Sequence, residues 1–272
     1  MSCEPPALSL HAVGRRYAPY RRPAQRLAHF LRPRRTPPGA FWALRGITLD
    51  IHRGESVAVL GRNGAGKSTL LQLIAGVLPP TEGELLIRGR VAPLLELGAG
   101  FDPEFTGREN IILASILVGI PPSEARRRAD AILDFAELAD VAAGPLKHYS
   151  SGMVARLGFA VATEWLPDIL LVDETLAVGD AGFQARCADR IDAHLRRGVT
   201  LLYVSHDPAS ARRLCARGLL LRAGRLSFDG PLPDAAAAYD AVAALPDRPR
   251  EDGANPPEGS LAESRRSSYP LP

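Results

Sequence analysis

The stretch GRNGAGKS, residues 61–68, decides the fold. It matches the pattern G-x-x-x-x-G-K-[ST] and lies between an expected buried strand, ESVAVL at 55–60, and an expected helix at 69–75. Glycines allow the backbone to wrap around a phosphate, and successive N–H groups at a helix start attract an anion. The sequence therefore predicts a phosphate-binding loop between a strand and a helix.

The lysine at position 67 supports this interpretation, because the chain otherwise relies on arginine. Among 33 basic residues only Lys67 and Lys147 are lysines. A lysine ammonium is a compact point charge that reaches the β- and γ-phosphates of a nucleotide, which the planar arginine fork does not duplicate. Ser68 is the expected Mg²⁺ ligand. The expected nucleotide-binding residues of this loop are Gly61, Asn63, Gly64, Ala65, Gly66, Lys67, Ser68 and Thr69, and the nucleotide is ATP if the resemblance described below holds.

Two further candidate site residues, both acidic, end an expected apolar strand, ILLVDE at 169–174. Asp173 at the strand tip would hold the water shell of Mg²⁺. Glu174 would orient the attacking water and accept its proton. The alternative is an acidic turn after a core strand. The guanine-reading motif N-K-x-D does not occur in the sequence, which argues against a GTPase.

A third motif, Tyr149 to Met153 (YSSGM), opens an expected helix at 152–165. In this order and spacing the chain resembles ABC-type ATPases, whose signature is L-S-G-G-Q. Ser150 and Gly152 match that signature, whereas Ser151 replaces its first glycine and Met153 its glutamine. The resemblance implies that Ser150, Ser151 and Gly152 contact the nucleotide held by a second copy. The alternative is that the serine only caps the helix.

The same resemblance implies roles for further residues. His206, in Ser-His-Asp after an apolar strand, would contact the γ-phosphate as a catalytic residue, and Asp180 would belong to the D-loop that crosses between subunits. Tyr17 would stack on adenine, although Tyr20 is a rival and packing in the core is the alternative. Glu96 lies where the family has a glutamine, and it is a candidate for Mg²⁺.

Four segments narrow the resemblance to the ATPase subunits of polysaccharide exporters, which move O-antigen, capsule or teichoic acid. They are FWALRGITLDI, ELGAGFDPEFTGREN, YSSGM and DETLAVGDAGFQ, and the match covers about residues 8–230. It implies a homodimer that binds ATP and Mg²⁺ at the cytoplasmic face of the inner membrane. It also implies a separate membrane permease that carries a lipid-linked glycan. A nucleic-acid partner is not expected. The alternatives are a transporter of another substrate, a soluble ABC ATPase, and a P-loop kinase.

The expected fold is α/β: a P-loop NTPase core of the ABC ATPase type, a small antiparallel β subdomain and a helical subdomain near 100–165. We expect one nucleotide-binding domain over 1–244, with a basic insertion at 18–40, and a disordered tail at 245–272. A carbohydrate-binding β-sandwich is not expected after the ATPase core. The expected strands and helices, besides those above, are strands at 8–17, 43–51, 84–91, 168–172 and 200–205, a short helix at 25–31 and an amphipathic helix at 121–143.

Composition and charge favour an ordinary soluble protein, with 46% hydrophobic and 23% charged residues. The longest apolar run, 111–120, is about half of a membrane span, and no secretory signal is expected. Three dispersed cysteines argue against a disulfide framework and favour a reducing cytoplasm. Residues 15–35 contain eight arginines and no acid. This segment is either a solvated basic loop or a membrane-facing segment that meets lipid or glycan phosphates.

Overall fold

The structure is a computed structural model, and it describes residues 5–18, 39–95, 97–173 and 179–243. Backbone contacts divide the chain into two compact units. The first comprises residues 1–15 and 43–246, and the second comprises residues 16–42 and 247–272. The expected short helix at 25–31 and the tail at 245–272 lie outside the described residues.

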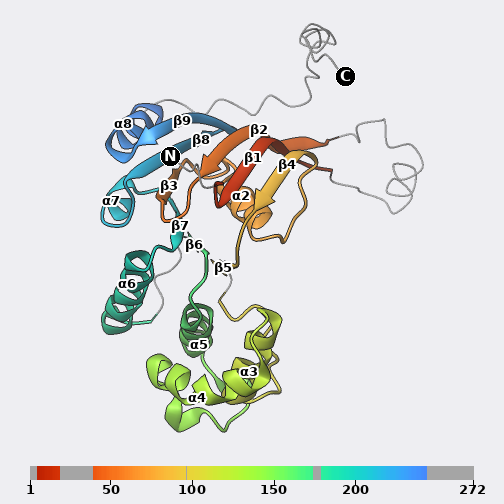
Figure 1. Ribbon diagram of the computed structural model, residues 1–272, viewed down its shortest axis with the longest axis vertical. Coiled ribbons are helices and arrows are strands. Elements are labelled where there is room, and N and C mark those ends of the chain that lie inside the picture. Colours follow the sequence, from red (N-terminus) through yellow and green to blue (C-terminus); the bar gives the residue numbers. More distant parts are fainter. Residues whose placement is uncertain (1–4, 19–38, 96, 174–178, 244–272) are drawn as a thin grey trace, which may run out of the picture. The chain divides into compact units, whose positions relative to one another are not determined.

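A six-stranded sheet with the order β5-β6-β7-β3-β8-β9 forms the centre of the first unit (Figure 1). Its strands pair in parallel from β5 to β8, and β9 is antiparallel to β8. The strands are β3 (Ser56–Leu60), β5 (Val91–Leu94), β6 (Ile169–Asp173), β7 (Thr200–Ser205), β8 (Arg217–Arg222) and β9 (Arg225–Pro231).

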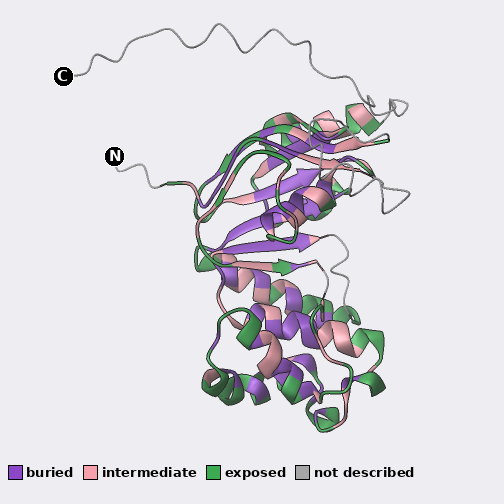
Figure 2. Cartoon of the chain, turned by 90° about the vertical axis from the view of Figure 1, so that its right-hand side faces the viewer, coloured by how far each residue is buried: buried purple, intermediate pink, exposed green. Residues whose placement is uncertain are grey.

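Alternation along the central strands explains why both faces of this sheet are covered. In β3, Val57 and Val59 belong to one core cluster, whereas Ala58 and Leu60 belong to another. Successive side chains of a strand point to opposite faces, so a continuous apolar run such as VAVL buries both. Figure 2 shows these central strands as buried.

Helices from different parts of the chain cover the two faces. Helix α2 (Lys67–Ile74) supplies Leu70 and Leu73 to the cluster that contains Val57. The opposite cluster receives residues of four helices: α5 (Ser151–Glu164), α6 (Ala181–Arg196), α7 (Pro208–Ala211) and α8 (Leu232–Ala243).

A small antiparallel sheet with the order β2-β1-β4 adds to the first core cluster. Leu8 and Leu10 of β1 and Ile47 of β2 are fully or almost fully buried there. The strands are β1 (Leu8–Tyr17), β2 (Phe41–Ile51) and β4 (Glu82–Ile87).

A helical subdomain has its own core, to which Ile111, Ile132 and Leu157 contribute. A capping box starts its first helix: the Thr106 hydroxyl accepts a hydrogen bond from Glu109 N–H, and the Glu109 carboxylate accepts from Thr106 N–H. Its elements are α3 (Gly107–Leu117), α4 (Pro122–Ala136), α5 (Ser151–Glu164) and the short 3₁₀ helices Ala139–Val141 and Leu146–His148. The expected α/β class, antiparallel subdomain and helical subdomain are confirmed.

Two expected elements differ from the structure. The strand expected at 84–91 is two strands in two sheets, because the chain breaks at Gly89, which has φ +120° and no room for a Cβ beside Asp168. The helix expected at 121–143 ends at Ala136, because Glu137 adopts a left-handed conformation with φ +57°.

Among the described residues no helix is both long and apolar enough to cross a membrane. In the second unit, the ring of Tyr17 stacks on that of Phe41 with 5.7 Å between centroids, and Arg16 lies over the ring of Trp42.

Candidate active site

The phosphate-binding loop follows β3 and closes on itself through Lys67. The ammonium of Lys67 donates to the carbonyl oxygen of Gly61 at 2.6 Å and to that of Arg62 at 3.2 Å. Only 7% of Lys67 is exposed, so its charge is held inside the loop and not in solvent. These two hydrogen bonds place the ammonium of Lys67 within the phosphate-binding loop, and its predicted contact with the phosphates stays a prediction.

Gly66 explains why helix α2 starts where it does. Its φ is +110°, a conformation that other residues rarely adopt, and an added Cβ would lie 2.7 Å from the carbonyl oxygen of Ala43. Because no side chain caps α2, the N–H groups of its first turn face the loop without a protein carboxylate there. Such a helix start fits a phosphate anion.

The register of the parallel sheet brings three predicted groups to one edge. Leu60, the residue before the loop, is paired with Ser205, and Asp173 is paired with Val204. The carboxyl ends of parallel strands meet at the same edge, so the loop, Asp173 and His206 gather there. Ser68 and Asp173 also line the same pocket, which has a volume of about 460 Å³. This arrangement suits one Mg²⁺ between a hydroxyl, a carboxylate and phosphates.

His206 is exposed on a turn that its neighbours hold rigid. The Ser205 hydroxyl accepts a hydrogen bond from Asp207 N–H at 2.9 Å. The Asp207 carboxylate caps α7 by accepting from Ala209 N–H and Ser210 N–H at 2.9 and 3.2 Å. The turn thus presents the imidazole of His206 beside the end of β7.

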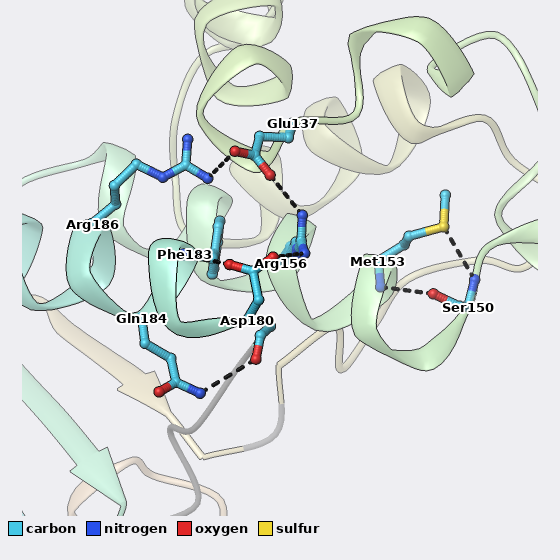
Figure 3. Close-up of polar contacts among 9 residues, drawn as sticks. Glu137, Ser150, Met153, Arg156, Asp180, Phe183, Gln184 and Arg186 are labelled. Carbon is cyan, nitrogen blue, oxygen red and sulfur yellow. Dashed lines mark hydrogen bonds and ion pairs between the residues drawn. The ribbon is translucent and has the colours of Figure 1, made fainter.

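The signature segment forms an N-terminal cap on α5. The Ser150 hydroxyl accepts from Met153 N–H at 3.2 Å, and Ser150 N–H donates to the Met153 sulfur at 3.4 Å (Figure 3). Methionine thus completes the capping box in place of glutamine. Ser150, Ser151 and Gly152 are all exposed, and the cap uses Ser150 Oγ as an acceptor, so its O–H can still donate to a phosphate.

Tyr149 fixes the approach to this segment. Its hydroxyl donates to the carbonyl oxygen of Val141 at 2.9 Å, and it packs so closely on Gly107 that an added Cβ would lie 2.6 Å from the phenol oxygen. Burial raises the pKa of Tyr149. The hydroxyl therefore stays protonated and keeps donating at neutral pH.

Asp180 begins helix α6 and is an exposed carboxylate. It accepts from Phe183 N–H at 2.9 Å and pairs with Arg156 at the same distance. The Phe183 hydrogen bond first, and then the charge of Arg156, hold the pKa of Asp180 below its usual value. Asp180 is therefore ionised at neutral pH.

Several predicted residues stay untested. Glu174, Glu96 and Tyr20 lie outside the described residues, and Tyr17 belongs to the second unit. Arg156 is not among the residues predicted from the sequence, because its two carboxylate partners lie 19 and 24 positions away along the chain.

Comparisons with known proteins agree with this geometry. The family model described as "ABC transporter" matches residues 44–177. The chain is also 46% identical over 225 residues to the ABC transporter protein AbcA of Aeromonas salmonicida, covering 83% of this chain and 73% of that protein. The chain belongs to the ABC transporter family.

Two further relatives of this ABC ATPase are named for glycan export. The O-antigen export system ATP-binding protein RfbB of Klebsiella pneumoniae is 48% identical over 186 residues, which are 68% of this chain and 76% of that protein. The teichoic acids export ATP-binding protein TagH of Listeria monocytogenes serotype 4b is 37% identical over 233 residues, which are 86% and 69% of the two chains.

Solved structures show the same fold. An ATP-binding subunit of an ABC transporter matches with a TM-score of 0.68 and 24% identity, over 86% of this chain and 93% of that one. A dimeric ATP-binding cassette bound to ADP and Pi matches with a TM-score of 0.65 and 24% identity, over 83% of this chain and 98% of that one. As an ABC ATPase, the chain binds and hydrolyses ATP.

Proposed function

We propose that this ABC ATPase powers export of a lipid-linked polysaccharide across the cytoplasmic membrane through a separate permease. The observation that carries the proposal is the 48% identity to an O-antigen export ATP-binding protein over 186 residues. The teichoic acids export ATP-binding protein of Listeria monocytogenes matches over a longer part of the chain, 233 residues. The subunit would act at the cytoplasmic face of the inner membrane.

The proposed catalytic unit is a homodimer, since each chain carries one phosphate-binding loop and one signature segment. The loop of one copy and the segment Ser150–Gly152 of the other would enclose ATP. Within one copy, the helix start at Lys67 would hold the phosphates, and Lys67 would stabilise the charge that develops on the γ-phosphate.

Mg²⁺ is proposed to bind between Ser68 and Asp173. Among the described residues no cluster of three or more histidine, cysteine or acidic side chains could hold a metal by itself. Mg²⁺ at nucleotide sites needs only one or two carboxylates from the protein, because substrate phosphates and water supply the other ligands. Asp173 offers a carboxylate and Ser68 a hydroxyl in the same pocket. Glu96 remains a proposed additional ligand, and Tyr17 the proposed adenine contact.

The export role is tested by inactivating Lys67 in cells. In Lys67→Ala the phosphate-binding loop loses its only lysine, so surface polysaccharide should be lost while the lipid-linked precursor accumulates inside the cell. The matched control is Lys147→Ala, which removes the other lysine, an exposed one that pairs with Glu104. Normal surface polysaccharide in Lys67→Ala would contradict the proposed function, and loss of the precursor itself would indicate a role in synthesis.

The basic insertion gives a second test in the same assay. Replacing Arg21, Arg22, Arg26 and Arg32 by glutamine should lower surface polysaccharide, because each cation near an anionic membrane surface contributes about 1 kcal/mol. ATP hydrolysis by the isolated subunit should stay unchanged. These four residues lie outside the described part of the structure.

The control for this variant carries the same change of charge elsewhere. Arg126, Arg127, Arg196 and Arg197 are exposed, and replacing them by glutamine removes four positive charges from the helices. If both fourfold variants export equally, the insertion is a solvated loop and the membrane-facing role is wrong.

A further inference from the structure

Arg156 of helix α5 joins two segments that are distant in sequence. One terminal nitrogen of its guanidinium lies 2.7 Å from the Glu137 carboxylate, at the end of α4, and the other lies 2.9 Å from the Asp180 carboxylate (Figure 3). The same guanidinium lies over the ring of Phe183, 5.2 Å from its centroid. A rigid planar fork with two partners fixes their relative position better than a single flexible contact would.

The backbone next to Asp180 packs against this arginine. Gly179 has φ +73°, and an added Cβ would lie 3.0 Å from the Nε atom of Arg156 and 3.1 Å from Cβ of Phe183. Gln184 also donates to the carbonyl oxygen of Gly179 at 3.3 Å. The start of α6 is thus positioned against Arg156 by an ion pair and by packing, and the Gln184 hydrogen bond holds the backbone of Gly179 to α6.

Helix α5 connects this contact to the signature segment. Ser150 caps α5 and Arg156 is six residues further on, which is less than two helical turns. Arg156 is only 21% exposed, whereas Glu137 and Asp180 are 50% and 64% exposed. The arginine is therefore held by its surroundings, and its carboxylate partners reach it from the surface.

We propose that Arg156 is a positioning residue that couples the signature segment to the D-loop, so that both reach the nucleotide of the partner copy in one fixed arrangement. This inference rests on the proposed homodimer with its composite ATP sites. Arg156 contacts no substrate. It acts through Asp180 on one side and through the start of α5 on the other.

A merely stabilising role is the competing explanation, and Arg186 provides the control for it. Arg186 pairs with the same Glu137 carboxylate at 2.6 Å and lies over Phe183 at the same 5.2 Å as Arg156. No ion pair between Arg186 and Asp180 is found among the described residues. Arg186→Gln therefore removes a similar ion pair and a similar ring contact, but it leaves the link between Arg156 and Asp180 in place.

The experiment compares four variants of the full chain: Arg156→Gln, Asp180→Asn, the double variant and Arg186→Gln. Asparagine can still cap α6, so Asp180→Asn removes the charge and keeps the helix start. We measure kcat and KM for ATP, nucleotide affinity of the monomer, and the melting temperature. Both single variants should lower kcat about tenfold with unchanged monomer affinity, and the double variant should be no worse than either, because they remove one shared contact.

Arg186→Gln should retain wild-type kcat although its melting temperature falls about as much as that of Arg156→Gln. Equal loss of kcat in Arg186→Gln, or additive losses in the double variant, would show that the network only stabilises the fold. If Arg156→Gln does not fold, wild-type kcat in Asp180→Asn overturns the inference by itself. Failure of the proposed homodimer is distinct, because the wild-type protein itself would then show no ATP-dependent dimerisation, and failure of the proposed export role would appear only in the surface polysaccharide of Lys67→Ala cells.

Discussion

Glu174→Gln should bind ATP normally and hydrolyse it about 10²–10⁴-fold more slowly, because the attacking water loses its base. The residue before it, Asp173, ends β6 at the edge of the sheet where β3 ends and the phosphate-binding loop begins. Glutamine keeps the size of the side chain and can still hold the water, so the phosphate contacts should remain. The measurement compares kcat and the equilibrium affinity for ATP between Glu174→Gln and the wild-type protein.

The same variant should trap the homodimer, since ATP that is not hydrolysed keeps the two copies joined. Size-exclusion chromatography with ATP and Mg²⁺ should show a dimer for Glu174→Gln and a monomer without nucleotide. Glu104→Gln is the matched control, because Glu104 is an exposed acid that pairs with Lys147. A monomer at saturating ATP would contradict the composite site, and wild-type turnover would contradict the role of Glu174.

The strand, loop and helix around Lys67 could be predicted because their signal is local. The motif, the apolar run before it and the helix after it all lie within about twenty residues. The order of the parallel strands then brings Asp173 and His206 to the same edge, a consequence of topology that follows from the strand pattern.

Other features could not be predicted, because they depend on contacts between distant residues. Strand β5 has four residues, includes Pro93 and lies at the edge of the sheet, so it carries almost no pattern of its own. The contact of Arg156 with Glu137 and Asp180 joins residues 19 and 24 positions away, which no periodicity shows. Met153 replaces the glutamine of the family signature, and the sequence did not indicate that its sulfur would complete the cap on α5.

Gly152→Asp, a change in the signature segment, should cause the second large loss of ATP hydrolysis. An added Cβ at Gly152 meets only the Ser150 hydroxyl oxygen, at 3.9 Å, so the fold of α5 tolerates a side chain there. If this exposed position faces the γ-phosphate held by the partner copy, the carboxylate should repel it and reduce hydrolysis by two orders of magnitude or more, on the order of 3 kcal/mol of lost electrostatic stabilisation. Gly152→Asn is the matched control, since it has nearly the same shape without the charge.

Mixing variants tests whether the segment acts on the partner's nucleotide. A dimer of one Gly152→Asp copy and one Lys67→Ala copy contains one damaged site with both changes and one site with neither. Mixing should therefore restore ATPase activity that neither variant has alone. By itself, the Gly152→Asn control should retain most ATPase activity, because the charge of the aspartate and not its bulk causes the loss in Gly152→Asp. Equal activity of Gly152→Asp and wild type would mean that Ser150 only caps α5, and that the exposed start of this helix does not meet a phosphate.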